Sequence, residues 1–175
     1  MLTNLQLNLK TDYPEYVDQT LCDLCHADSK ANCTGLNSTS DSLASVQYIN
    51  IDEISHKIAL PKVKICDGII IDVLKKEILL VEITIPAKPL SKSCEDYKKE
   101  FTDKIRGTRF ILKHLAYKIY KLKFHGNNIK LKFKPIFSKV PPSLAPKQAQ
   151  LNIAEMLMLK SISVNNIVIL DMHIC

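Results

Sequence analysis

Residues 66–86, CDGIIIDVLKKEILLVEITIP, decide the fold of this chain. Two runs of β-branched and aliphatic residues, IIIDV (69–73) and ILLVEITI (78–85), flank the charged stretch LKKE. Short apolar runs joined by a polar turn are typical of a β-hairpin. Because both faces of the second run are apolar except at Glu82 and Thr84, we expect it to be a buried central strand.

Helix signals lie on both sides of this hairpin. Upstream, INIDEISHKIAL (49–60) predicts a short helix capped by Asn50 or Asp52. Downstream, apolar residues recur at steps of three and four over 93–123, apart from one skipped turn at Thr108. This spacing predicts one long amphipathic helix, or two helices that meet near Gly107.

The remaining elements complete an α/β order of helices and strands. Residues 129–134 alternate strictly between apolar residues and lysines, which predicts a half-exposed strand over NIKLKFKPIF with a lysine-covered face. A helix is expected over about 147–160 and a last short strand within 165–175. Residues 1–45 read as an irregular N-terminal segment, so we place the folded domain at 46–175.

Composition limits the function classes. At 175 residues the chain has the size of one domain, and it lacks the ~18–20-residue apolar run that a membrane span requires. We therefore expect an intracellular protein, in the nucleus or cytoplasm, with no membrane partner and mostly reduced cysteines. Residues 98–139 contain 13 Lys/Arg and two acidic residues, whereas 1–97 contain 9 basic and 14 acidic residues. This asymmetry suits a polyanionic partner beside a cation site, or a lysine-rich surface that only keeps the protein soluble.

Asp67 and Glu82 are the candidate functional residues on the hairpin. An unpaired carboxylate inside a buried strand costs several kcal/mol or becomes protonated, so Glu82 requires a partner. Paired strands lie about 5 Å apart, and two carboxylates at that spacing can share one Mg²⁺. The alternative without a metal is that Glu82 is ion-paired to a lysine and that Asp67 caps a turn through its backbone.

The pattern resembles a known nuclease core. Lys64-Ile65-Cys66-Asp67, the hairpin, Glu82-Ile83-Thr84-Ile85-Pro86 and a helix with Tyr97-Lys98-Lys99 are similar to the PD-(D/E)XK, or restriction-like, nucleases. The likeness is strongest to the C-terminal endonuclease of site-specific non-LTR retrotransposons and covers about residues 62–140. It implies a restriction-endonuclease-like mixed sheet with a central β-hairpin flanked by helices. The sequence departs from the family at Cys66, where proline is usual, and at Thr84, where the standard motif has lysine.

The resemblance also implies a function, namely Mg²⁺- or Mn²⁺-dependent hydrolysis of phosphodiester bonds in nucleic acid, with DNA favoured over RNA. Asp67 and Glu82 would hold the metal. Lys98 or Lys99 would replace the missing motif lysine and stabilise charge on the phosphate. The basic residues that would bind the phosphates of the nucleic acid are Arg106, Arg109, Lys113, Lys130, Lys132 and Lys134. Two rivals stay open: an inactive nucleic-acid-binding module that kept the fold, and an interaction domain with no nucleic-acid role.

A second constellation precedes the hairpin. Cys22-x2-Cys25 followed by Cys33 resembles the knuckle that retrotransposon endonucleases carry upstream of the nuclease core, which would bind Zn²⁺. His26 is adjacent to Cys25, a cramped position for a shared tetrahedral site, and a chance cysteine pair is the alternative.

Overall fold

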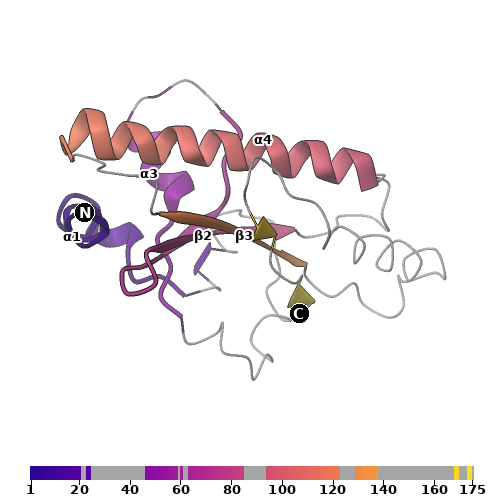
Figure 1. Ribbon diagram of the computed structural model, residues 1–175, viewed down its shortest axis with the longest axis horizontal. Helices are drawn as coiled ribbons and strands as arrows, with labels where there is room; N and C mark the ends of the chain where they lie inside the picture. The colour runs from indigo at the N-terminus through magenta and orange to yellow at the C-terminus, as the bar shows by residue number, and fades with distance from the viewer. Residues whose placement is uncertain are drawn as a thin grey trace.

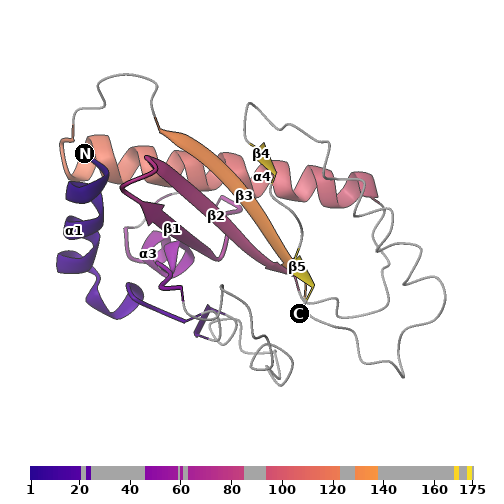
Figure 2. The same ribbon diagram turned by 60° about the horizontal axis from the view of Figure 1, so that its bottom comes forward.

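The structure is a computed structural model of the 175-residue chain. It describes residues 1–20, 23–24, 46–58, 60, 63–84, 94–122, 129–137, 168–169 and 173–174. The long helix α4 (Cys94–Lys113) runs along one side of a mixed β-sheet, and the shorter helices α1 (Leu2–Asp12) and α3 (Ile51–Lys57) lie near one end of it (Figures 1 and 2). The expected α/β class is therefore confirmed.

The sheet is built around the predicted hairpin. Strand β1 (Gly68–Asp72) pairs antiparallel with β2 (Glu77–Thr84). Strand β3 (Lys130–Phe137) follows α4 and pairs with β2 in parallel, which makes a β-α-β unit. The short strands β4 (Val168–Ile169) and β5 (His173–Ile174) both pair in parallel with β3, where the sequence predicted one last strand.

The two faces of the sheet pack against different layers. On the α4 face, Leu80 of β2 and Phe133 of β3 are fully buried, and the rings of Phe101 and Phe133 lie 5.1 Å apart between centroids. On the other face, Val81 packs with Tyr48 and partly buried neighbours. Strand alternation assigns the remaining residues to these two faces, and this decides where each candidate side chain lies.

Helix α4 is continuous through Gly107, which resolves the question of one helix or two. A Cβ at Gly107 would lie 1.9 Å from the carbonyl oxygen of Lys64, so the absence of a side chain lets the preceding loop pack against the helix. The helix continues directly into η3 (His114–Ile119), a single π-helical segment.

The first part of the N-terminal segment, which was predicted to be irregular, is helical. Residues Leu2–Asp12 form α1, followed by the 3-10 turn η1 (Pro14–Tyr16). Leu2, Leu5 and Leu9 are buried in the same hydrophobic core as the strands. Their three- and four-residue spacing is a helical signal in the sequence, so this part of the chain belongs to the folded domain.

Two other predictions have different outcomes. The predicted short helix is confirmed as α3, with Asn50 as its N-cap; the Asn50 side chain accepts a hydrogen bond of 3.0 Å from the Glu53 N–H. The predicted helix over about 147–160 lies outside the described residues. Among the helices that are described, none has the length and apolar character to cross a membrane.

Candidate functional site

Asp67 and Glu82 face each other across the hairpin. The register pairs Gly68 with Val81, which places Asp67 opposite Glu82 at the next position. Glu82 lies on the face of β2 that α4 covers, because alternation along the strand places it with Leu80. Glu82 is 3% exposed, as expected for a buried central strand. Asp67 immediately precedes β1, and its carboxylate is close enough for its charge to raise the pKa of Glu82.

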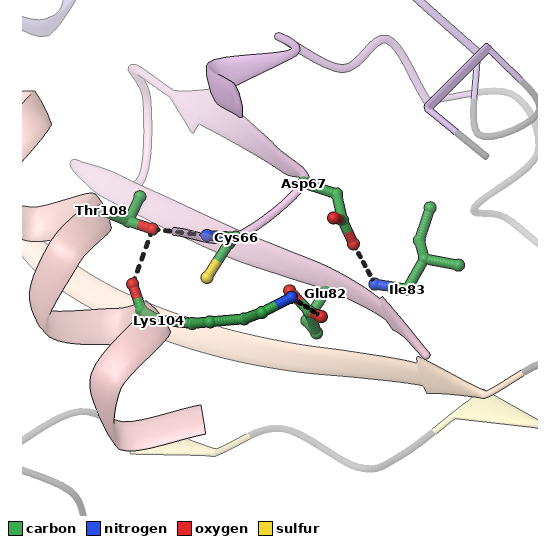
Figure 3. Close-up of polar contacts among 6 residues, drawn as sticks. All are labelled: Cys66, Asp67, Glu82, Ile83, Lys104 and Thr108. Atoms are coloured by element: carbon green, nitrogen blue, oxygen red, sulfur yellow. Dashed lines mark hydrogen bonds and ion pairs between the residues drawn. The ribbon is translucent and has the colours of Figure 1, made fainter. Parts of the chain in front are cut away.

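A lysine from α4 that was not predicted from the sequence, Lys104, reaches Glu82. The ammonium of Lys104 donates a hydrogen bond to Glu82 Oε1, and the Lys104 side chain is 19% exposed (Figure 3). Lys99 is exposed on the helix surface, and the side chain of Lys98 lies outside the described residues. The sequence did contain a signal for Lys104, because it sits between the buried residues Phe101 and Ile105 at the edge of the apolar helix face.

Burial dominates the electrostatics of Glu82. Loss of hydration, the largest effect, and the negative charge of Asp67 together raise the pKa of Glu82 from 4.5 to about 8, against the opposing effect of Lys104. Burial lowers the pKa of Lys104, but the two carboxylates outweigh burial and leave it raised. In the described part of the chain, no hydrogen-bond partner reaches Glu82 Oε2. One oxygen of a buried carboxyl group is thus satisfied by Lys104, and the other is left without a partner.

Asp67 is fixed by the backbone of β2. Its Oδ2 accepts a hydrogen bond of 2.6 Å from the Ile83 N–H, next to Glu82 in the chain. The ion pair of Glu82 with a lysine is that of the alternative without a metal, whereas the hydrogen bond of Asp67 joins it to the neighbouring strand rather than to a turn. The same contacts also hold both carboxylates in place, so they are compatible with a preorganised binding site.

A buried hydrogen-bond chain connects this site to α4. The Cys66 N–H donates to Thr108 Oγ1 at 2.8 Å, and this hydroxyl donates to the Lys104 carbonyl at 2.8 Å (Figure 3). Thr108 therefore links the residue before Asp67 to the residue that contacts Glu82. Burial raises the pKa of the Cys66 thiol well above its ordinary value, and the charge of Glu82 adds to this, so Cys66 is a neutral packing residue.

The basic residues form two surfaces on opposite sides of the molecule. Because Phe133 faces α4, alternation along β3 directs Lys130, Lys132 and Lys134 to the other face of the sheet. Lys132 there forms an ion pair of 2.7 Å with Glu77. The basic residues of α4 that were predicted to bind phosphates are exposed on the outer side of the helix, namely Arg106, Arg109 and Lys113. The helix and the sheet therefore separate the β3 lysines from the basic residues of α4.

Asp67 and Glu82 are the two candidate metal ligands that the described residues supply on the hairpin. Within the described ranges, no three or more His, Cys, Asp or Glu side chains gather as a metal-binding group. Asp67 and Glu82 alone match the one or two carboxylates that Mg²⁺ commonly takes, with water and phosphate oxygens as its other ligands. The predicted zinc ligands Cys22, Cys25 and Cys33 lie outside the described residues.

No protein-family model, curated protein or solved structure matches this chain. Its function is therefore argued from the residues and geometry described above.

Proposed function

We propose that this chain is a metal-dependent phosphodiesterase acting on nucleic acid, with a restriction-endonuclease-like fold. The observation that carries the proposal is the buried Glu82 Oε2 atom, which has no hydrogen-bond partner among the described residues and lies beside a second carboxylate. An unsatisfied buried carboxyl oxygen is costly, and an arriving cation would satisfy it. Strongly perturbed carboxyl groups of this kind cluster at functional sites.

Asp67 and Glu82 would be the metal ligands in this proposal. A bound Mg²⁺ or Mn²⁺ would supply Lewis-acid activation of the scissile phosphate and of a water molecule. Glu82 would lose its proton when a cation binds, because the added positive charge favours the ionised carboxylate. Asp67, held by the Ile83 N–H, keeps its carboxylate beside Glu82.

Lys104 takes the role that the resemblance assigned to Lys98 or Lys99. Its ammonium is held at the carboxylate pair by Glu82 Oε1, and the two carboxylates raise its pKa. A fixed positive charge at this position would stabilise negative charge that develops on a phosphate oxygen. The helix that follows the hairpin thus supplies the lysine missing two residues after Glu82.

The second candidate is a nucleic-acid-binding module that has lost catalysis. It is favoured by the contacts already made in the site, since Lys104 pairs with Glu82 and the Ile83 N–H bonds to Asp67. In that case the three side chains would only stabilise the hairpin against α4. The two candidates differ in metal binding and in cleavage, so both properties need to be measured.

Cleavage of labelled DNA and RNA oligonucleotides with Mg²⁺ or Mn²⁺ tests the proposal. Replacing a residue that only supports a metal ligand typically lowers the rate by roughly 10–100-fold. We expect Glu82→Gln and Asp67→Asn to lower it by more, because each replaces a proposed metal ligand. Lys104→Gln should cost about 10²–10³-fold. Glu77→Gln is the matched control, because Glu77 lies on the same strand and pairs with Lys132 away from the site. Cleavage that persists in Glu82→Gln would contradict the proposal.

Metal binding is measured independently by the shift in unfolding temperature. A cation that binds only the folded chain at 100 times its Kd adds about 2.7 kcal/mol to the free energy of unfolding. This gain should appear in the parent chain and in Glu77→Gln but not in Glu82→Gln. A parent chain that gains no stability from either metal and cleaves nothing, yet binds nucleic acid, would support the inactive module.

A further inference from the structure

The outer face of α4 and η3 carries exposed aromatic rings between basic side chains. Phe110 is 47% exposed and Tyr117 is 43% exposed, although both belong to a helix that packs along the sheet. Arg106 and Lys113 are also exposed on this helix. Basic and aromatic residues alternate along this face at intervals of four, three and four residues, in the order Arg106, Phe110, Lys113, Tyr117. Each interval is about one helical turn, roughly 5.4 Å along the axis.

This stripe is separate from the apolar face of the helix. The inner face is occupied by buried residues that contact the sheet side of the molecule, among them Phe101, Ile105 and Leu112. Figure 1 shows α4 lying along one side of the sheet, so its two faces have different surroundings. Packing of the hydrophobic core therefore does not explain why residues 110 and 117 are aromatic.

The Phe110 ring is supported from the same helix. His114 lies one turn after it, and the two ring centroids are 6.5 Å apart with their planes tilted by 39°. His114 also begins the π-helical segment η3, and π-helical turns occur frequently at functional sites. Arg109, exposed one turn before Lys113, adds a further positive charge beside the stripe.

We propose that this stripe, Arg106, Arg109, Phe110, Lys113 and Tyr117, binds single-stranded nucleic acid. Exposed aromatic rings stack on unpaired bases, and neighbouring cations neutralise the phosphates between them. A duplex offers only its phosphates to such a surface, because its bases are already stacked on each other. The exposed cations of the stripe, Arg106, Arg109 and Lys113, complement a polyanion and disfavour a basic partner.

The stripe would hold the strand rather than cleave it. Lys104 and Glu82 lie between the helix and the sheet, on the side of α4 away from Arg106 and Phe110. The inference rests on the proposed function only in taking nucleic acid as the ligand. Binding measured in EDTA is independent of the metal site, so failure of cleavage and failure of stripe binding can be told apart.

Fluorescence anisotropy of the full chain with short oligothymidine and oligouridine, in EDTA, tests this inference. Loss of one stacked base costs about 1–3 kcal/mol, so Phe110→Ala or Tyr117→Ala should weaken binding by about 5- to 150-fold. Phe110→Leu keeps the apolar surface but loses the stacking face and should weaken binding as Phe110→Ala does, whereas Phe110→Trp should bind as the parent. The control is Leu74→Ala in the hairpin turn, a 95% exposed apolar residue away from α4, which should change nothing.

Salt dependence tests the basic residues of the stripe. Each phosphate contact on a single strand contributes about −0.7 to the slope of log K against log salt. Replacing Arg106, Arg109 and Lys113 by Gln should therefore flatten that slope by about 2 units. Lys75→Gln in the hairpin turn is the charge control and should leave the slope unchanged.

Three results would overturn the inference. Equal affinity for a duplex of the same sequence would show that unpaired bases are not read. Phe110→Leu with parental affinity, together with equal competition by polyphosphate, would show a purely electrostatic surface. A parent chain that is oligomeric in sedimentation, and that becomes monomeric in Phe110→Ala, would show that a second copy covers the stripe. All of the substituted side chains are exposed, so folding is checked by circular dichroism and should be unaffected.

Discussion

Replacing Glu82 by Gln should make this protein more stable at neutral pH. Gln has nearly the shape of a protonated glutamate, and its amide oxygen can accept the hydrogen bond that Lys104 donates to Glu82 Oε1. The substitution therefore removes the ability to ionise while it preserves the contact. Asp67 remains as the negative partner of the Lys104 ammonium.

The size of the effect follows from the pKa of Glu82, which is about 8 in the folded chain and 4.5 in its ordinary range. Below about pH 4.5 the group is protonated in both states, and its contribution to stability is fully present. Between these values the unfolded chain ionises and the folded chain does not, so stability falls by about 1.4 kcal/mol per pH unit. By pH 7 the parent chain should have lost about 3 kcal/mol that Glu82→Gln retains.

Urea unfolding at a series of pH values from about 4.5 to 8 measures this difference. Other groups titrate over the same range, but they are common to both proteins and cancel in the difference between parent and variant. Glu77→Gln is the control; it should keep the slope of the parent because Glu82 is still present. A parent chain that gains stability over Glu82→Gln as the pH rises would show that the ionised pair is favourable, and would refute this reasoning.

Two further substitutions test how α4 is held against the site. Gly107→Ala should destabilise the fold by about 1–3 kcal/mol or more, because its Cβ would meet the Lys64 carbonyl oxygen at 1.9 Å. Alanine normally stabilises a helix relative to glycine, so a rise in the unfolding temperature would show that this close approach does not occur. Thr108→Val should cost about 1–3 kcal/mol in urea unfolding, because the buried Cys66 N–H loses its acceptor. Thr108→Ser keeps that hydroxyl, and a loss as large as that of valine would show that the hydrogen bond is not the cause.

The hairpin could be predicted because its signals are local. Two continuous apolar runs, the charged turn between them and the carboxylate inside the second run together placed Glu82 on a buried strand, and the structure confirms both the strand and the burial. The same is true of α3, where Asn50 is a local capping signal. Opposition of Asp67 and Glu82 follows from the register of a short hairpin.

The contact of Lys104 depends on tertiary packing and was therefore missed. In the sequence, Lys98, Lys99 and Lys104 are three lysines on one predicted helix, and only the rotation of α4 against the sheet selects among them. Thr108 carried a clue to that rotation, since it interrupts the apolar spacing of the helix while remaining fully buried. Its hydroxyl bonds to Cys66 and thereby fixes which helix face meets the hairpin.

The placement of the lysines on β3 also required the sheet topology. Alternation separates Lys130, Lys132 and Lys134 from Phe133, but it does not say which of the two faces α4 covers. The contact between Phe101 and Phe133 decides this, because it puts the apolar residues of β3 under the helix. The basic composition of residues 98–139 thus divides between two sides of the fold, and the sequence alone presents it as one block.

The energetics of the carboxylate pair favour a functional over a purely structural role. A buried lysine–glutamate contact is often no more stable than apolar side chains of similar size, because both charges lose hydration. Here Asp67 adds a second negative charge beside Glu82, which raises the pKa of Glu82 further and increases that cost. A hairpin that only needed to hold α4 would be better served by a leucine at position 82, next to the apolar residues of the same strand. A bound divalent cation would reverse the balance, because it would make two adjacent carboxylates, and an oxygen that has no hydrogen-bond partner among the described residues, favourable together. The gain in stability with Mg²⁺ or Mn²⁺, and its loss in Glu82→Gln, is therefore the measurement that separates a binding site from a costly structural contact.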